Sequence, residues 1–267
     1  KYPKLPSRNK MEKFFLDLSI KDLVELSKSK KLNKNLEAVT LLNQPYVPEL
    51  EDLYLIYKLV EINKRTTILE IGSGWSSLII KLALDKLKKN FTVDAKKLRR
   101  KNLFEIFILE SENKYLKTTK DLIKKYSIDT MNMKYLYSTS NMTTYNGQIC
   151  HEFNKLPNCN PDFIYLDGPG KDIVKKKINN ITVSKNFDMP VMSCDILKIE
   201  FFLIPGTIVL IDGRGANTNF LRKNFKRKWE YKYFKKYLYS HFLLKSTNIL
   251  RNMINMFLFY RTIVLEK

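Results

Sequence analysis

The stretch Thr67–Ser77, TILEIGSGWSS, decides the fold predicted for this chain. The apolar run at 66–71 predicts a short buried strand, and apolar residues recur at helical spacing after Ser77. Gly72 and Gly74 stand between the two elements, where glycine permits a tight turn and leaves no Cβ in the way of a ligand. Backbone amides at the start of the helix then face a polar or anionic group. The stretch therefore predicts the strand, glycine loop and helix of a nucleotide-binding corner.

Strands and helices alternate along the rest of the chain. Helices are predicted from Pro48 to about 60, after the glycine loop to about 87, and over about 113–126; further strands are predicted at 104–109, 133–137, 162–166, 207–211, 229–234 and 237–244. The strands are apolar without alternation, which is typical of a parallel sheet covered on both faces. We therefore expect an α/β, Rossmann-like fold with a mostly parallel sheet, helices on both faces and a C-terminal antiparallel edge hairpin. The simplest division is a helical N-terminal extension at 1–47 and a Rossmann-like domain at 48–267.

The chain is strongly basic, with a net charge of +21 over 267 residues. Basic clusters at 28–31, 96–101 and 223–228 have two interpretations: lysine-rich, solvated helix faces, or a surface for a polyanionic partner, either nucleic acid or anionic lipid. The longest apolar run near the end of the chain, at 256–260, is too short to span a bilayer. The three cysteines form no paired motif, which indicates free buried thiols and a cytoplasmic setting. The oligomeric state is not predicted.

Glu70, two residues before the first glycine, separates two kinds of nucleotide-binding corner. Dinucleotide fingerprints read GxGxxG, and here Ser77 occupies the third glycine position. A nicotinamide-dependent oxidoreductase is therefore disfavoured. The order acid-x-Gly-x-Gly instead resembles motif I of class I S-adenosylmethionine-dependent methyltransferases, in which the acid helps to organise the loop near the methionine part. The frequent third glycine of that family is replaced here by Ser76.

Glu110 supplies the second feature expected of such a corner, an acid at the end of the next strand. A carboxylate suits this place because it accepts two hydrogen bonds from the vicinal hydroxyls of a ribose. Glu70 and Glu110 lie 40 positions apart, against about 20 in the compact fingerprint, and the basic segment at 89–102 accounts for the excess. Glu112 is the alternative ribose partner.

Two further acids follow predicted strands. Asp167 lies in NPDFIYLDGPG and Asp212 in LIDGR, and ligands of open α/β sheets bind beyond the carboxyl ends of strands. Asp167 is a candidate general base. Arg214 either clamps an anionic group of the substrate or makes a surface salt bridge. His151 is a weaker candidate.

The resemblance to class I methyltransferases covers most of residues 48–245, with a tract at 193–212 that looks like a bacterial branch of the family. It implies an enzyme that transfers a methyl group from S-adenosylmethionine, with an oxygen of a small molecule or saccharide as the acceptor. The cofactor-binding residues it implies are Glu70, Gly72, Gly74, Trp75, Ser76 and Glu110, and the catalytic residues are Asp167, Asp212 and Arg214. In catechol-type branches, acids equivalent to Asp167 and Asp212 bind a divalent cation such as Mg²⁺. That branch has Asn after the second acid, whereas this chain has Gly213, with Asn217 nearby.

Two alternatives remain open from the sequence. The net charge of +21 favours an RNA methyltransferase; the DGPG tract after Asp167 disfavours base methylation but allows ribose methylation. A binding protein that keeps the fold without catalysis is the other alternative. Asp195 and Glu200 are expected to lie on the surface of the helix before the strand at 207–211, although Asp195 could face the ligand.

Overall fold

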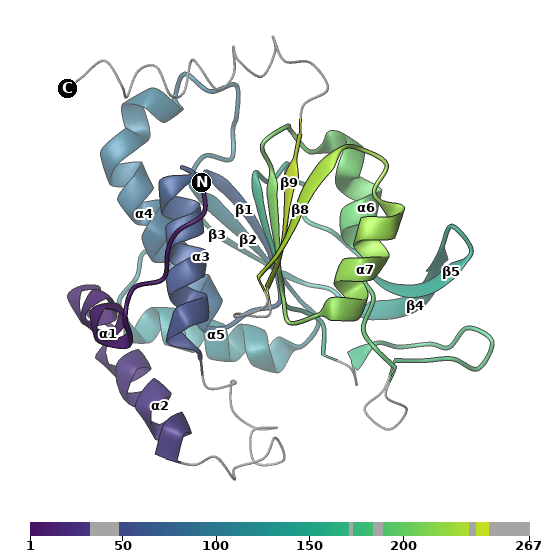
Figure 1. Cartoon of the computed structure of the whole chain (residues 1–267), viewed down its shortest axis with the longest axis horizontal. Coiled ribbons are helices and arrows are strands. Elements are labelled where there is room, and N and C mark those ends of the chain that lie inside the picture. Colours follow the sequence, from purple (N-terminus) through teal and green to yellow (C-terminus); the bar gives the residue numbers. More distant parts are fainter. Residues whose placement is uncertain (33–47, 171–172, 184–188, 235–238, 246–267) are drawn as a thin grey trace.

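A seven-stranded sheet forms the centre of the computed structural model, which describes residues 1–32, 48–170, 173–183, 189–234 and 239–245 (Figure 1). The strands lie in the order β3-β2-β1-β6-β7-β9-β8. Their bounds are β1 Thr67–Ile71, β2 Glu105–Glu110, β3 Met133–Tyr137, β6 Phe163–Leu166, β7 Ile208–Asp212, β8 Trp229–Phe234 and β9 Tyr239–Leu244. Strand β9 is antiparallel to both of its neighbours, and the other pairs are parallel. The predicted Rossmann-like sheet with a C-terminal antiparallel hairpin is confirmed; residues 237 and 238 of the last predicted strand lie outside the described residues.

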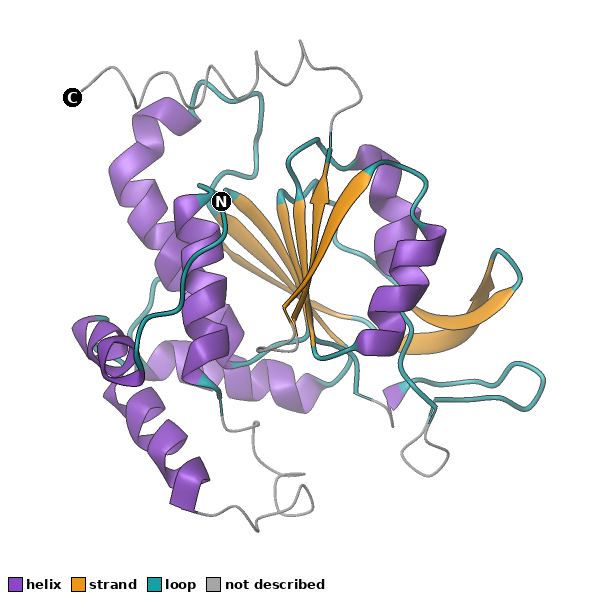
Figure 2. Ribbon diagram, viewed as in Figure 1, coloured by secondary structure: helices purple, strands orange, loops and turns teal. Residues whose placement is uncertain are grey.

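Helices cover both faces of this sheet (Figure 2). Their bounds are α1 Arg8–Asp17, α2 Lys21–Leu32, α3 Leu50–Ile62, α4 Trp75–Ala95, α5 Asn113–Lys125, α6 Asp195–Ile199 and α7 Gly215–Asn224, with a short 3₁₀ helix η4 at Glu200–Phe202. Helices α3, α4 and α5 lie on one face and α6 and α7 on the other. In the described part of the chain no helix, the 21-residue α4 included, is long and apolar enough to cross a bilayer.

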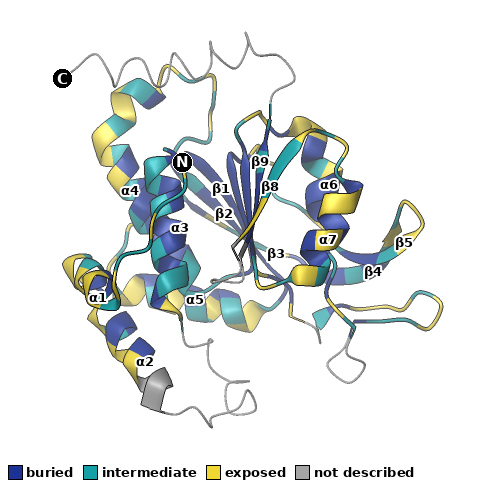
Figure 3. Cartoon of the chain, viewed as in Figure 1, coloured by how far each residue is buried: buried dark blue, intermediate teal, exposed yellow. Residues whose placement is uncertain are grey.

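The core explains why the strands read as continuous apolar runs. Successive side chains of a strand point to opposite faces, so a strand buried on both faces needs apolar residues at every position. Ile68 and Ile106 pack with the helices α3, α4 and α5, whereas Leu69 and Phe107 pack with α6 and α7. Figure 3 shows the sheet buried between the two layers.

The N-terminal helices share the core of the sheet domain. Phe15 of α1 and Leu23 of α2 are fully buried and belong to the cluster that includes Leu50 and Tyr57 of α3. The predicted boundary at residue 47 falls among residues 33–47, which lie outside the described residues, as does the tail at 246–267. The division into an extension and a domain therefore stays a prediction.

A hairpin that the sequence analysis missed follows β3. The residues between the predicted strands at 133–137 and 162–166, to which the sequence analysis assigned no element, contain two antiparallel strands, β4 Ser140–Tyr145 and β5 Gln148–Phe153. Asn146 and Gly147 connect them, and both have positive φ (+49° and +74°). This is the geometry of a two-residue hairpin turn, for which Asn-Gly is the preferred pair. The hairpin projects beside the sheet near the carboxyl ends of its parallel strands (Figure 1).

Candidate functional site

The glycine corner lies where the chain changes direction across the sheet. Strand β1 is flanked by β2 on one side and β6 on the other, so the connections after β1 and after β3 run to opposite sides. Ligands of open α/β sheets bind outside the carboxyl ends of the strands at such a point. The loop 72–74 occupies this place and leads directly into α4.

Glycine is required at two contacting positions of this corner. Gly72 has φ of +113°, and its amide donates a hydrogen bond to the carbonyl of Leu109 (2.9 Å). A Cβ on Gly168, in the loop after β6, would lie 2.8 Å from the nitrogen and 2.9 Å from the Cα of Gly72. The backbones of the two loops therefore pack directly on each other. Gly74 has φ of +151°, and a Cβ there would meet no atom within 4 Å, so its open side is available to a ligand.

Glu70 is fully buried beneath the glycine loop. Its carboxylate accepts hydrogen bonds from the hydroxyls of Ser76 and Ser77, the latter at 2.6 Å. Both serines belong to the first turn of α4, so Glu70 ties the end of β1 to the start of that helix. Burial raises the pKa of Glu70 to about 8, although the two serine hydrogen bonds lower it. The acid therefore joins the end of β1 to the residues that follow the loop, and its role in cofactor binding stays a prediction.

Glu110 lies at the carboxyl end of β2 and touches the same loop. Its Oε2 accepts a hydrogen bond from the hydroxyl of Ser73 (2.9 Å), and its Oε1 accepts from the amides of Ser111 (2.6 Å) and Glu112 (3.1 Å). The side chain is buried, which raises its pKa, while these hydrogen bonds lower it. The carboxylate that was predicted to bind the ribose hydroxyls is therefore held next to the open side of the glycine loop.

Trp75 opens α4 directly after the loop. Its ring packs against Tyr126 at the end of α5, with 6.1 Å between the ring centroids. The side chain is half-buried and borders the core cluster on the α5 side of the sheet. A contact of Trp75 with a cofactor stays a prediction.

Asp167 and Asp212 end the neighbouring strands β6 and β7. Desolvation by the surrounding protein raises the pKa of Asp167, as does the charge of Asp212, whereas Arg214 lowers it. The side chain of Asp167 is 47% exposed, so water limits the size of this upward shift. The pKa of Asp212 is raised in the same direction by desolvation. Two acids thus face one site, and the pKa of each is raised, so each holds its proton to a higher pH than a free aspartic acid does.

Arg214 reaches back from the end of β7 to the loop after β6. Its guanidinium donates hydrogen bonds to the carbonyl of Pro169 (3.0 Å) and to that of Asp167, and lies 3.6 Å from the Asp167 carboxylate. The arginine therefore fixes the 167–169 loop that packs on Gly72. These contacts support the salt-bridge interpretation of Arg214, and its contact with a substrate stays a prediction.

The donor set fits a divalent cation poorly. Among the described residues, no group of three His, Cys, Asp or Glu side chains could hold a metal ion. Asn217, near the second acid, is buried in α7 and exchanges hydrogen bonds with the backbone of Ser193 (3.0 and 3.2 Å). Only Asp167 and Asp212 remain as candidate metal ligands, and the positive charge beside Asp167 is already supplied by the Arg214 guanidinium.

Buried polar residues hold the segments around the site, and the sequence analysis misjudged two of them. Asp195 neither faces a ligand nor lies on a helix surface: it is 1% exposed and accepts hydrogen bonds from the amide of Phe153 (3.0 Å) and the hydroxyl of Ser193 (2.6 Å). It thereby ties β5 to α6. Glu200 is likewise fully buried, not a surface residue. In both cases backbone donors far along the chain stabilise the acid.

The histidine and the cysteines of this region are also enclosed. His151 is fully buried in β5, with its Nδ1 3.0 Å from the hydroxyl of Ser140. Burial lowers the pKa of His151 to about 3. Cys150 and Cys194 are free and buried, as expected, whereas the free Cys159 is only partly buried.

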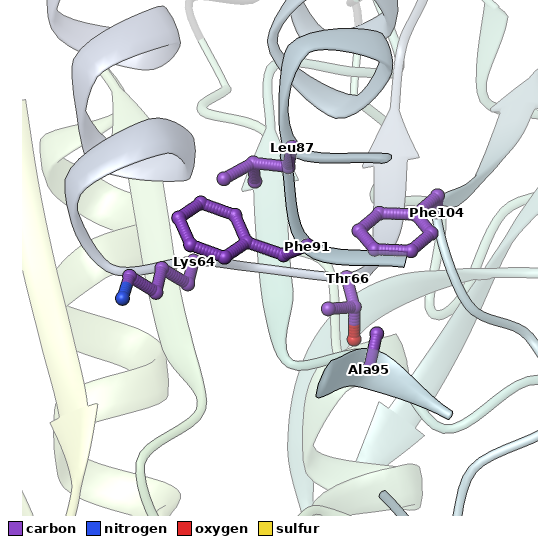
Figure 4. Close-up of a pocket in the computed structure, with 6 residues that line it drawn as sticks. All are labelled: Lys64, Thr66, Leu87, Phe91, Ala95 and Phe104. Carbon is purple, nitrogen blue, oxygen red and sulfur yellow. The ribbon is translucent and has the colours of Figure 1, made fainter. Parts of the chain in front are cut away.

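Two hollows among the described residues lie away from the glycine loop. One, of about 170 Å³ with the solvent at its mouth included, lies at the amino end of β1 (Figure 4) and is lined by Lys64, Thr66, Leu87, Phe91, Ala95 and Phe104. Thr66 and the glycine loop stand at opposite ends of that strand. The other, of about 330 Å³ counted in the same way, is apolar and includes Met142 and Cys150 of the hairpin in its lining. Neither contains the acids of the candidate site.

Known structures with a similar fold are methyltransferases. The Podospora anserina methyltransferase PaMTH1, SAH-bound, is 14% identical over 91% of this chain and 99% of its own, with a TM-score of 0.47. TomG, an O-methyltransferase of Streptomyces achromogenes in complex with SAM, is 10% identical over 91% and 100%, with a TM-score of 0.43. An O-methyltransferase of Bacillus cereus in complex with SAH is 12% identical over 90% and 93%, with a TM-score of 0.40.

The strand order and the helices on both faces make the fold Rossmann-like. No protein-family model matches the sequence, and no match was found among curated proteins. Identities of 10–14% with TM-scores below 0.5 carry no argument about cofactor, acceptor or catalytic residues. Those rest on the glycine corner and the four acids around it.

Proposed function

We propose that the chain binds S-adenosylmethionine at the loop 72–74 and transfers its methyl group to an oxygen of a small molecule or saccharide. The observation that carries the proposal is the position of Glu110. The carboxylate ends the strand next to the glycine loop and is hydrogen-bonded to Ser73 within that loop (2.9 Å). An acid at this place, beside a loop with an open side at Gly74, fits a nucleoside whose ribose offers two adjacent hydroxyl donors.

The hydrogen-bond partners of Glu110 hold its carboxylate in an orientation that suits a diol. Two backbone amides fix Oε1, which sets the orientation of the carboxylate, and only a rotatable serine hydroxyl occupies Oε2. A ribose hydroxyl replaces the Ser73 hydroxyl without moving the backbone, because a hydroxyl can turn to another acceptor. Glu70 keeps the loop and α4 in register through Ser76 and Ser77.

In this proposal Asp167 receives the proton of the acceptor. The oxygen–carbon bond forms as the sulfur–carbon bond breaks, so the sulfonium becomes a neutral thioether and the acceptor hydroxyl loses its proton. A base works best when its pKa lies near the working pH, and the pKa of Asp167 is raised toward that range. Arg214 holds the backbone of the Asp167 loop by two carbonyls and so positions this base.

Calorimetric titration with S-adenosylmethionine and with S-adenosylhomocysteine tests the proposal. We expect both to bind, and Glu110→Gln to weaken both by roughly tenfold to a hundredfold, since a hydrogen bond to a charged group contributes about 1.5–3 kcal/mol. The matched control is Glu112→Gln, two positions along the chain, where the amide that binds Glu110 is kept. The absence of heat with either ligand, from a folded protein, would refute the proposal. Equal affinities of the Glu110 and Glu112 variants would refute the ribose assignment.

A further inference from the structure

Two phenylalanines project into solvent on the segment that leads into β7. Phe201 is 71% exposed and Phe202 75% exposed, and Ile204 after them is 39% exposed. Leu203, between them, is buried at 3% and anchors the segment in the core. Single exposed apolar residues are ordinary, but three large ones within four positions form a patch of the kind that marks an interaction surface.

The segment is held firmly with these side chains outward. The buried carboxylate of Glu200 accepts hydrogen bonds from the amides of Lys226 and Arg227 and from the indole of Trp229 (2.8–3.1 Å). The Arg227 guanidinium returns to the carbonyl of Glu200 (2.9 Å), and the Asn160 amide binds the carbonyl of Phe202 (2.7 Å). Because the backbone is fixed from several sides, exposure of the two rings is a built feature of the fold.

Cations surround the patch at the amino ends of the parallel strands. They come from segments that precede β1, β2 and β8. Arg65 binds the carbonyl of Gly206 (2.8 Å), and Arg100 binds that of Asn160 and lies 3.8 Å from the Asp162 carboxylate. Lys226, Arg227 and Lys228 follow one another along the chain, and the first two bind Glu200. Two acids of this end are turned inward, whereas the side chain of Glu230 is 35% exposed and pairs with Lys232 and Lys245. Glu200 is fully buried, and Asp162 is 6% exposed and accepts hydrogen bonds from Thr66 and Thr67. The surface that remains is apolar at its centre and positive at its rim.

Further cations at the same end repel one another. The pKa of Lys64 is lowered by desolvation and by Lys1, although Asp94 raises it. An anionic partner at this end relieves that repulsion.

We propose that this amino-end surface, made of Phe201, Phe202 and Ile204 with Arg65, Arg100, Lys226, Arg227 and Lys228, docks the chain on an anionic lipid bilayer. The phenylalanines insert at the boundary of headgroups and acyl chains, and the cations lie against lipid phosphates. The candidate methyl-transfer site, at the carboxyl ends of the strands, then faces away from the bilayer into water. The docking does not depend on the proposed methyl transfer.

A bilayer fits this surface better than RNA does. RNA-binding proteins offer side-chain donors to bases and phosphates together with stacking rings. Here Arg65, Arg100 and Arg227 donate hydrogen bonds to backbone carbonyls. They therefore offer a partner positive charge more than directed hydrogen bonds. The apolar centre consists of projecting Phe and Ile side chains, which carry no polar atoms. Such side chains suit insertion into a bilayer.

Vesicle co-sedimentation of the full chain tests the docking. We expect binding to phosphatidylcholine vesicles that contain phosphatidylglycerol, little binding to phosphatidylcholine alone, and a fall in binding as salt is raised. Replacing Phe201 and Phe202 together by Ser is expected to weaken binding roughly tenfold or more. Both side chains are exposed, so this variant keeps the fold, which circular dichroism verifies. Leu16→Ser, at an exposed position of α1, is the matched control and is expected to bind as the native chain does.

A charge pair separates the local surface from the overall charge. Lys226→Glu with Lys228→Glu changes two exposed cations of the surface, and Lys117→Glu with Lys124→Glu changes two exposed cations of α5 by the same net charge. We expect only the first pair to lose vesicle binding. Equal losses from both pairs, equal binding of the double phenylalanine variant and the native chain, or equal binding to neutral and anionic vesicles would each overturn the proposal. The proposal would also be overturned if the native chain did not bind vesicles but bound poly(U), and if that RNA binding required Phe201 and Phe202.

Discussion

Glu70 should make the stability of the fold fall as pH rises through the neutral range. Its side chain is fully buried and has two serine hydroxyls as partners. Burial raises its pKa to about 8 from the ordinary 4.5. A carboxyl with a higher pKa in the folded than in the unfolded state binds a proton more tightly in the folded state. Its favourable protonation is therefore complete below pH 4.5 and is lost progressively as pH rises to about 8.

The substitution Glu70→Gln isolates this effect because glutamine has nearly the same shape and does not ionise. Within the window from about pH 5 to pH 8, the free energy of unfolding of the native chain should fall relative to that of the variant. The slope is about 1.4 kcal/mol per pH unit, which amounts to about 4 kcal/mol by pH 8. Any fixed cost of placing an amide beside Ser76 and Ser77 shifts the whole curve and leaves the slope unchanged.

Urea unfolding followed by circular dichroism at several pH values between about 5 and 8 measures this slope. Whatever the difference in stability between the variant and the native chain at low pH, it must move in favour of the variant as pH rises. Glu112→Gln, at a partly exposed position at the start of α5, is the control and should run parallel to the native chain. If the Glu70→Gln curve is also parallel, the carboxyl does not hold a raised pKa and the reasoning fails.

Three further outcomes are expected. Gly168→Ala should destabilise the chain by about 1–3 kcal/mol and reduce S-adenosylmethionine binding, because its Cβ would lie 2.8 Å from the Gly72 nitrogen. The control is Gly215→Ala, where a Cβ meets nothing within 4 Å. It should leave the free energy of unfolding nearly unchanged in the same urea titration. Glu200→Ala should cost about 3 kcal/mol or more, because three donors lose a buried acceptor, and the fluorescence of the Trp229 indole should shift. Asp167→Asn should lower the methyl-transfer rate about 10²–10⁴-fold with unchanged cofactor affinity, while EDTA should leave the native rate unchanged; a rate abolished by EDTA and restored by Mg²⁺ would contradict our interpretation of the two acids.

The sheet and its glycine corner could be predicted because local sequence determines them. Strands buried on both faces must be apolar throughout, and those runs are visible without knowledge of any contact. Gly72 and Glu70 were recognised by their spacing within one turn of chain. The contact of Gly72 with Gly168 was not, since it joins loops 96 positions apart.

The β4–β5 hairpin was missed because its strands are mostly polar. The pattern SNMTTY buries Ser140 and Met142 and leaves their neighbours partly open, so no long apolar run announces a strand. The signal that was present is local: Asn146-Gly147 between two stretches rich in Thr, Tyr and Ile favours a two-residue hairpin. Asp195 and Glu200 were misjudged for the opposite reason. Their partners are backbone amides 42 and 26 positions away, and an acid on a short helix gives no local sign of such partners.

The most consequential property that the sequence concealed is the separation of charge between the two ends of the sheet. A total of +21 suggests attraction of polyanions everywhere, yet the carboxyl ends gather Glu70, Glu110, Asp167 and Asp212. Their mutual repulsion contributes to the raised pKa values of Glu70 and Asp167. An RNA strand entering there would bring phosphates against these acids, whereas a neutral small molecule or saccharide would not. The positive charge that favoured an RNA acceptor in the sequence therefore argues, once placed in space, for an anionic bilayer as the partner of the amino ends and for an uncharged acceptor at the carboxyl ends.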